Sequence, residues 1–199
     1  YRTRSLILSA YSQLAKRKPP SVVAEKRAPH LGQVRYNQAA MLAFVVKTLG
    51  RTDLGRVAYD KVIYFAQEHL GIDLGLQFKR MAAGPWDPDL KYKVEPLATK
   101  QKWLVTEDSP SGKVLFAPGP KIEEAIEQVR RRFGNDTIQQ VEDLCLFFNS
   151  LGIGNFGLER WATIHMCWKE MSASGQQVTE ECLIQEVLNL SLIHISEPT

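Results

Sequence analysis

Residues that build disulfides, metal centres and catalytic sites are scarce in this chain of 199 residues, which has three cysteines and four histidines. The cysteines, at positions 145, 167 and 182, form no CxxC pair and fall on helical patterns. We expect them to be small core side chains in a reducing compartment and not a disulfide framework. The apolar run from Met41 to Val46 is too short to span a bilayer. These absences predict a cytoplasmic protein with no membrane partner.

Sequence patterns of catalysis are missing as well. The glycine-rich stretch from Gly152 to Gly157 resembles a phosphate-binding loop only superficially, because it follows a predicted helix and not a strand. Cys145 or Cys167, combined with His69 or His165, shows no spacing that is typical of a catalytic pair. We therefore predict that the chain itself has no catalytic residue, no bound cofactor or metal, and no small-molecule substrate.

Basic residues are concentrated near the N-terminus. Residues 1–36 contain eight Lys or Arg and one acidic residue, Glu25, out of totals of 25 and 22. The slightly acidic remainder brings the formal net charge down to +3. Such a basic arm adds affinity for phosphates without reading nucleotide sequence, and a solvated linker is the alternative. The candidate phosphate contacts in the arm are Lys16, Arg17, Lys18, Lys26 and Arg27.

Proline, charge and periodicity divide the chain into segments. Residues 1–15 have helical spacing and are expected to end a helix that begins upstream. Residues 16–33 form a basic, proline-containing linker, and the folded module is predicted over 34–189. Residues 190–199 resemble the translation of a transposase sequencing adapter. We therefore expect a non-native tail on a gene fragment that is cut at both ends.

Hydrophobic periodicity predicts the elements of the module. Helices are expected over 37–49, 56–70, 89–101, 120–132, 135–149 and 158–171, with another from residue 179. The helix over 89–101 must bend or restart at Pro96, which cannot donate a backbone hydrogen bond. A short strand is expected over 74–81, and strands over 103–107 and 113–117 flank a turn as a β-hairpin. This order predicts a mainly α (α+β) fold with a winged-helix-like helical core, one small β-hairpin and a C-terminal helical extension.

Two clusters of side chains are expected to be structural. Trp161, His165 and Trp168 share one helical face, so we expect them to pack in the core or an interface, with His165 hydrogen-bonded and not a ligand. The run Arg130 to Arg132 ends a predicted helix, where cations stabilise the negative end of the helix dipole.

Lysines on and around the third predicted helix are the main candidates for contact with DNA. In a winged helix this element faces the major groove, where lysines contact phosphates. Asp87, Asp89 and Glu95 are interspersed and leave an excess of only three positive charges. A dedicated DNA reader usually has a stronger basic stripe, so a solvated face of mixed charge is the alternative. The candidate residues are Lys79, Arg80, Lys91, Lys93, Lys100 and Lys102.

Two short stretches resemble known families. Gly55 to Gln67 reads Gly-Arg-Val-Ala-Tyr-Asp-Lys-Val-Ile-Tyr-Phe-Ala-Gln, and Ala82 to Asp87 reads Ala-Ala-Gly-Pro-Trp-Asp. A helix of this kind followed by a Gly-Pro turn resembles the Panacea family of SocA-like antitoxin domains. The two stretches resemble more closely a C-terminal module of some restriction–modification proteins, the type I specificity subunits. The residues that carry the resemblance are Gly55, Arg56, Tyr64, Gly84, Pro85, Trp86 and Trp103.

The two resemblances imply different partners. The restriction–modification family implies a non-catalytic accessory module on a DNA-targeting complex, with other protein subunits and DNA as partners. The Panacea family implies a domain that neutralises a toxin by direct contact or delivers it to a protease. Neither family supplies catalytic residues. A third interpretation is an appendage of an unidentified enzyme.

Overall fold

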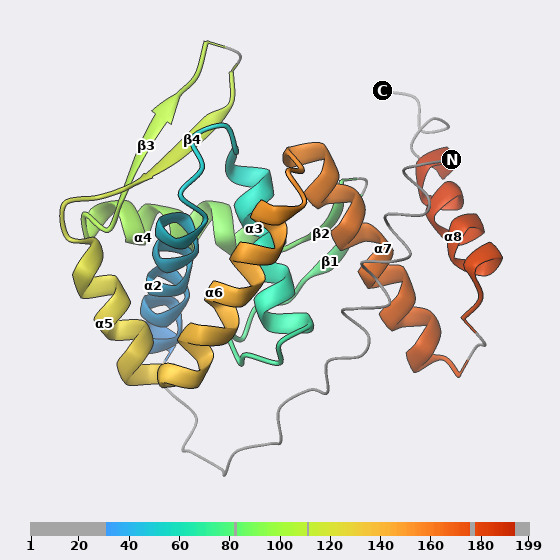
Figure 1. The fold of residues 1–199 in the computed structure, drawn as a ribbon, viewed down its shortest axis with the longest axis horizontal. Coiled ribbons are helices and arrows are strands. Elements are labelled where there is room, and N and C mark those ends of the chain that lie inside the picture. The colour runs from blue at the N-terminus through green and yellow to red at the C-terminus, as the bar shows by residue number, and fades with distance from the viewer. Residues whose placement is uncertain (1–30, 82, 111, 176–177, 194–199) are drawn as a thin grey trace.

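The computed structural model describes residues 31–81, 83–110, 112–175 and 178–193. Their fold is mainly α, as the sequence predicts (Figure 1). The helices are α2 (Leu31–Leu49), α3 (Arg56–Glu68), the π-helix η1 (Leu90–Val94), α4 (Glu95–Lys100), α5 (Ile122–Phe133), α6 (Asn135–Ser150), α7 (Asn155–Ala173) and α8 (Glu180–Ile193). The strands are β1 (Lys79–Met81), β2 (Gly84–Trp86), β3 (Leu104–Asp108) and β4 (Val114–Pro118).

Helix α2 lies in the middle of the core. Its residues from Ala39 to Val46 are at most 3% exposed, because α3, α4, α5 and α6 all pack around it (Figure 1). A helix that is apolar on every side must be covered on every side, which explains its central place. The helix begins at Leu31, so the predicted linker over 16–33 extends too far by the residues that form the first turn of α2.

The described part of the chain contains two small hairpins where the sequence predicts one. The predicted hairpin is β3–β4, with Leu104 opposite Pro118 and Asp108 opposite Val114. A single bridge also joins Gly55, just before α3, to Leu115 of β4.

The additional hairpin is β1–β2, in which Lys79 lies opposite Trp86 and Met81 opposite Gly84. All three residues of β1 are exposed, so the strand has no alternation of buried and exposed positions for sequence reading to detect. The strand predicted over 74–81 is therefore limited to its last three residues.

Helix boundaries differ from prediction at both ends of the module, and α2 starts at Leu31 where the sequence predicts a start at residue 37. Helix α7 starts at Asn155, three residues before the predicted start, and α8 includes residues 190–193 of the predicted tail. Cys145 and Cys167 are buried as expected, whereas Cys182 on α8 is exposed. Residues 1–30, with the arm cations and the predicted upstream helix, lie outside the described residues.

Helices α7 and α8 form a second, smaller packing unit beside the main core (Figure 1). Cys167, Met171 and Leu183 are buried between them. No helix in the part of the chain that the structure describes is both long enough and apolar enough to cross a membrane.

The close approach of β2 to α7 gives the first testable prediction. Gly84 has a φ of +82°, and a Cβ at this position would lie 2.5 Å from Thr163 Oγ1 and 3.3 Å from the Glu159 carbonyl oxygen. Gly84→Ala is therefore expected to lower the free energy of unfolding by about 2–4 kcal/mol, measured by urea denaturation.

Gly71→Ala is the matched control. Gly71 has a similar φ of +73°, but nothing lies within 4 Å of the added Cβ. Its cost should be about 1 kcal/mol, the backbone strain alone. Equal losses for the two variants would contradict a tight contact between β2 and α7.

Candidate binding surface

A buried lysine joins the two sequence stretches that carry the family resemblance. Lys61 on α3 is 1% exposed, and its Nζ donates a hydrogen bond of 2.7 Å to the carbonyl oxygen of Pro85 on β2. Burial lowers the pKa of Lys61, whereas Asp60 and Glu159 act in the opposite direction. An ammonium group in the core needs a partner, so the Gly-Pro turn is held against α3.

Asp60, the neighbour of Lys61, is a carboxyl group inside the core. It is 3% exposed, and burial raises its pKa to about 7. Lys61 and Arg56 lower this pKa, whereas the nearby acids Glu95 and Asp87 raise it further. The carboxyl group therefore changes its charge near neutral pH.

An ion pair between Arg56 on α3 and Glu95 at the start of α4 holds these two helices together. Arg56 Nε lies 2.5 Å from Glu95 Oε2, and Arg56 Nη2 lies 2.8 Å from Glu95 Oε1. This two-bond geometry orients both side chains as well as neutralising them. Glu95 is 9% exposed, so its charge is withdrawn from the surface of α4.

The other motif residues have structural positions. Tyr64 is buried and hydrogen-bonds through its hydroxyl to Nδ1 of His165, at 2.9 Å. Trp103 is fully buried and meets the Tyr36 ring edge-on. Trp86 is half-buried on β2, opposite Lys79. The expectation of a packed, hydrogen-bonded His165 is confirmed.

Proline shapes the helix that the sequence identifies as the candidate DNA-contacting element. Pro96 has no N–H and would clash with the carbonyl of Tyr92, so the preceding turn widens into the π-helix η1. The N–H of Glu95 accordingly bonds to the carbonyl of Leu90. The predicted restart at Pro96 is thus confirmed as a change from π-helix to α-helix.

The exposed side chains on and just after η1 and α4 keep an excess of three positive charges, because two of the three nearby acids are buried. The Asp87 carboxylate is buried and accepts hydrogen bonds from the backbone N–H groups of Gln77 and Asp89. Glu95 is held by Arg56, and Asp89 pairs with Lys93 at the surface. We use the name "cationic face" for the exposed side chains Lys91, Tyr92, Lys100 and Lys102.

Lys102 adopts an unusual backbone conformation at the end of α4. Its φ of +61° makes it the only non-glycine residue with a positive φ among the described residues. Its N–H bonds to the Thr99 carbonyl, and its own carbonyl accepts the N–H of Lys121. Such strain often marks a functional position, because the surrounding structure must maintain it.

Arg80 and Lys79 lie on strand β1 and not on η1 or α4. The Arg80 guanidinium lies 3.1 Å from Glu170 on α7 and 2.6 Å from Glu186 on α8, so it joins β1 to both helices. The Arg80 guanidinium is thus already paired with two carboxylates, which disfavours a phosphate contact at this side chain. Lys79 is exposed on β1.

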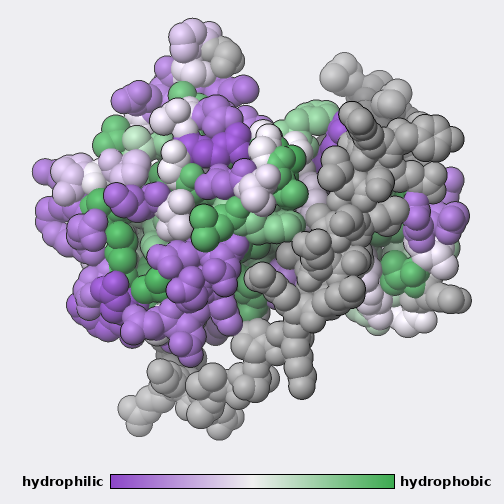
Figure 2. Space-filling view, viewed as in Figure 1, coloured by the Kyte–Doolittle hydropathy of each residue, from purple (hydrophilic) through white to green (hydrophobic). Residues whose placement is uncertain are grey.

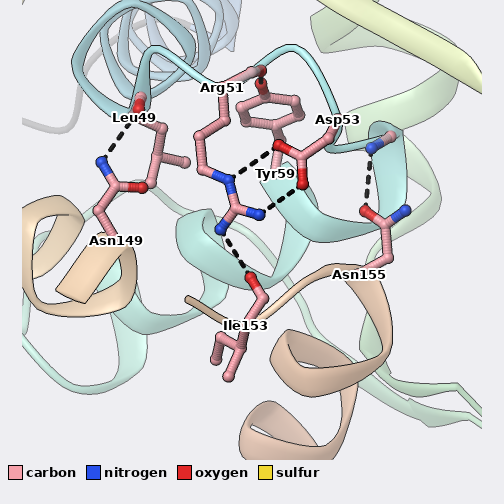
Figure 3. Close-up of polar contacts among 8 residues, drawn as sticks. Leu49, Arg51, Asp53, Tyr59, Asn149, Ile153 and Asn155 are labelled. Carbon is pink, nitrogen blue, oxygen red and sulfur yellow. Dashed lines mark hydrogen bonds and ion pairs between the residues drawn. The ribbon is translucent and has the colours of Figure 1, made fainter. Parts of the chain in front are cut away.

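A polar junction joins the turn before α3 to the turn before α7 (Figure 3). Arg51 makes two hydrogen bonds to the Asp53 carboxylate and a third, of 2.7 Å, to the carbonyl of Ile153. The Gly55 N–H donates to Asn155 Oδ1 at 2.9 Å, and Asn149 donates to the Leu49 carbonyl (Figure 3).

This junction forms one side of a cleft. The cleft has a volume of about 720 Å³ and lies between the first turn of α3, the end of the β3–β4 hairpin and the first turn of α7. The Gly152 to Gly157 stretch follows a helix, as predicted, and residues 154–157 line this cleft.

The remaining candidate groups for chemistry are buried in unreactive surroundings. Burial raises the pKa of Cys145 to about 12 and that of Cys167 to about 11, the opposite direction from an activated thiol. Burial lowers the pKa of His165 to about 3. Within the described ranges, no group of three or more His, Cys, Asp or Glu side chains is placed to hold a metal ion.

Sequence reading missed several residues on which these sites depend. Asp60 and Lys61 gave a signal, because two charges stand inside a helix whose apolar residues surround most of its circumference. Glu95 and Asn155 gave none, since their partners lie 39 and 100 residues away in the sequence.

Comparison with known proteins adds no assignment. No family model matches the chain, and no curated protein matches it.

Asp60→Asn is expected to stabilise the protein increasingly as pH rises from about 4 to 8. The folded-state pKa of about 7 lies above the unfolded value of 3.8, so the stability from the protonated carboxyl is present below pH 4 and lost as pH rises through 7. The gain at pH 8 is at most about 4 kcal/mol, since one pKa unit corresponds to about 1.4 kcal/mol. Urea denaturation of both proteins across this range measures it.

Asp89→Asn is the control for the same series. It removes a carboxylate from a surface pair with Lys93, and such pairs contribute less than about 1 kcal/mol. A difference between wild type and Asp60→Asn that does not change with pH would contradict the buried, proton-binding carboxyl.

Lys102→Gly is expected to raise the free energy of unfolding by about 1 kcal/mol, because glycine adopts a φ of +61° without strain. Lys100→Gly, at the last position of α4, is the matched control and should lower it by about 1 kcal/mol. Urea denaturation of the wild type and both variants measures these changes in the free energy of unfolding. A loss of stability in both variants would show that Lys102 is not strained.

Proposed function

We propose that this chain is a non-catalytic interaction module of a cytoplasmic restriction–modification protein, similar to a type I specificity subunit. In this proposal the cationic face contacts the phosphate backbone of duplex DNA, while other surfaces contact protein subunits. The observation that carries it is the fate of the acids: Asp87 and Glu95 are buried and bonded internally, which leaves Lys91, Lys100 and Lys102 exposed.

The order of the elements supports a winged-helix-like arrangement for the DNA-contacting part. Helices α2, α3 and α4 are followed by the β3–β4 hairpin, and the bridge from Gly55 to Leu115 places a short extended segment beside β4. In winged-helix proteins a helix following this order enters the major groove. Helix α4 packs against α2, and its last residue, Lys100, is exposed.

Phosphate contacts of this kind position a protein on DNA without reading its sequence. The exposed cations of this face are all lysines, which bind phosphate as point charges and lack the planar, two-bond geometry of arginine. We therefore expect the module to add affinity and orientation, while sequence is read elsewhere in the complex.

The alternative is an antitoxin-like module of the Panacea type, which binds a toxin or a protease adaptor. It is favoured by Phe156, which is 66% exposed in the cleft, since an exposed aromatic side chain in a cleft is typical of a protein-binding site. The third interpretation, an appendage of an unidentified enzyme, has no specific support among the described residues.

Replacing Lys91, Lys100 and Lys102 together by alanine is expected to weaken binding to duplex DNA and reduce its salt dependence. Each lost phosphate contact should decrease the slope of log K against log salt by about 0.9, so the slope should fall by up to about 3. Fluorescence anisotropy with a labelled duplex of unrelated sequence, measured between 50 and 200 mM salt (about the range over which such contacts are lost), tests this.

Lys121→Ala is the control, because Lys121 pairs with Glu124 at the start of α5. Deletion of residues 1–30 separates the contribution of the basic arm from that of the cationic face. An unchanged slope in the triple variant would contradict DNA contact by α4, and an unchanged slope in the deletion variant would contradict contact by the arm.

A further inference from the structure

The cleft between α3, α7 and the β3–β4 hairpin has features that the cationic face does not share. Its walls include Val57 on α3, Lys113 and Val114 on the hairpin, and Phe156 and Glu159 on α7. None of the exposed lysines of the cationic face lines it. An occupant of the cleft therefore touches none of the lysines that are proposed to contact DNA.

Apolar side chains are exposed in this cleft. Phe156 is 66% exposed and Val57 is 39% exposed, although every other phenylalanine of the chain is buried or half-buried. The Arg160 guanidinium lies 4.5 Å from the centroid of the Phe156 ring and covers one face of it. Figure 2 shows apolar surface in the upper middle of this view, where Figure 1 places the start of α7 beside that of α3.

The electrostatic balance of the cleft is positive. Asp53 is neutralised by Arg51, and Arg56 by Glu95. Of the remaining charges at the cleft, Lys113 and the adjacent Arg160 are cationic, and only Glu159 is anionic. Glu159 also interacts with the buried Lys61, whose pKa it raises.

Helices α3 and α7 both begin at the cleft, and neither has a side-chain hydrogen bond at its N-cap, so their dipoles add further positive potential. An anionic occupant is favoured.

The shape of the cleft favours a peptide over a nucleic acid. Val57 and Phe156 offer apolar contacts to a side chain, which a phosphate backbone does not supply. On the side of β4 that faces α3, only the single bridge to Gly55 is formed, so the described chain provides no further strand partner there. An extended peptide can hydrogen-bond to such an edge.

We propose that this cleft binds an extended acidic peptide of a partner protein, with one aromatic or large aliphatic side chain of the peptide packed against Phe156 and Val57. Acidic side chains on either side of this anchor pair with Lys113 and Arg160. The peptide backbone runs along β4 beside Gly55. The site serves protein recognition, and it applies whether the partner is a restriction–modification subunit or a toxin.

Selection from a displayed library of random 12-residue peptides tests the proposal and does not require the partner to be identified. The full chain is the bait, and selected peptides are resynthesised with a fluorescent label for anisotropy. The expected peptides carry net negative charge and one aromatic or large aliphatic residue. Their affinity should fall at least tenfold for Phe156→Ala and for Lys113→Glu.

Leu146→Ala is the matched control, because Leu146 on α6 is 63% exposed and lies outside the cleft. Circular dichroism melting of each variant establishes that it is folded. Peptides that bind equally well to wild type and to folded Phe156→Ala, an enrichment of basic peptides, or no enrichment at all would overturn the proposal. The triple alanine variant of Lys91, Lys100 and Lys102 should bind the peptides normally, so a failure of DNA binding and a failure of the cleft are distinguishable.

Discussion

The hydrogen bond from Lys61 to the Pro85 carbonyl is the constraint on which the arrangement of this protein depends. A fully buried ammonium cannot be left without an acceptor, so the Gly-Pro turn must lie against α3 wherever α3 lies in the core. The same turn places Gly84 against α7 and leads directly into Asp87. The carboxylate of Asp87 then bonds the backbone on both sides of the β1–β2 hairpin. One polar contact in the core thus fixes how α3, α7 and the start of η1 meet.

The charged groups around this contact shift the pKa of Asp60 in opposite directions, and burial has the largest effect on it. Asp60 lies among Glu95 and Asp87 as well as Lys61 and Arg56, yet desolvation is the largest influence and raises the pKa of Asp60. Glu95 has a two-bond arginine partner and remains an effective acceptor for it. Buried ionic groups of this kind contribute little to net stability, but removing one partner is costly. Their value lies in orientation, since apolar side chains alone would allow α3 and α4 to slide.

Much of the fold could be predicted from the sequence because it depends on local periodicity. Helices α3, α5 and α6 and the β3–β4 hairpin were found close to their observed bounds. The β1–β2 hairpin could not be predicted, since β1 has only exposed residues and β2 is buried by tertiary contacts with α7 and α3. The lysines of the candidate DNA face do lie exposed on and beside η1 and α4, but two of the three acids interspersed with them in the sequence are buried. Counting treats Glu95 as a surface acid, and only the tertiary contact with Arg56 shows that it is not.

Arg56 connects the two proposed surfaces, so binding at one surface is expected to affect binding at the other. Arg56 lines the cleft, and its guanidinium also neutralises Glu95 at the start of α4. An acidic peptide in the cleft competes with Glu95 for this guanidinium. Any share that the peptide takes leaves Glu95 less neutralised and makes the potential at α4 less positive. Because coupling between two sites is reciprocal, DNA at α4 would lower the affinity of the cleft for the peptide by the same factor. Under the two proposals together, an acidic peptide in the cleft and DNA at α4 therefore weaken each other's binding. The Arg56–Glu95 ion pair is the physical link between the two surfaces.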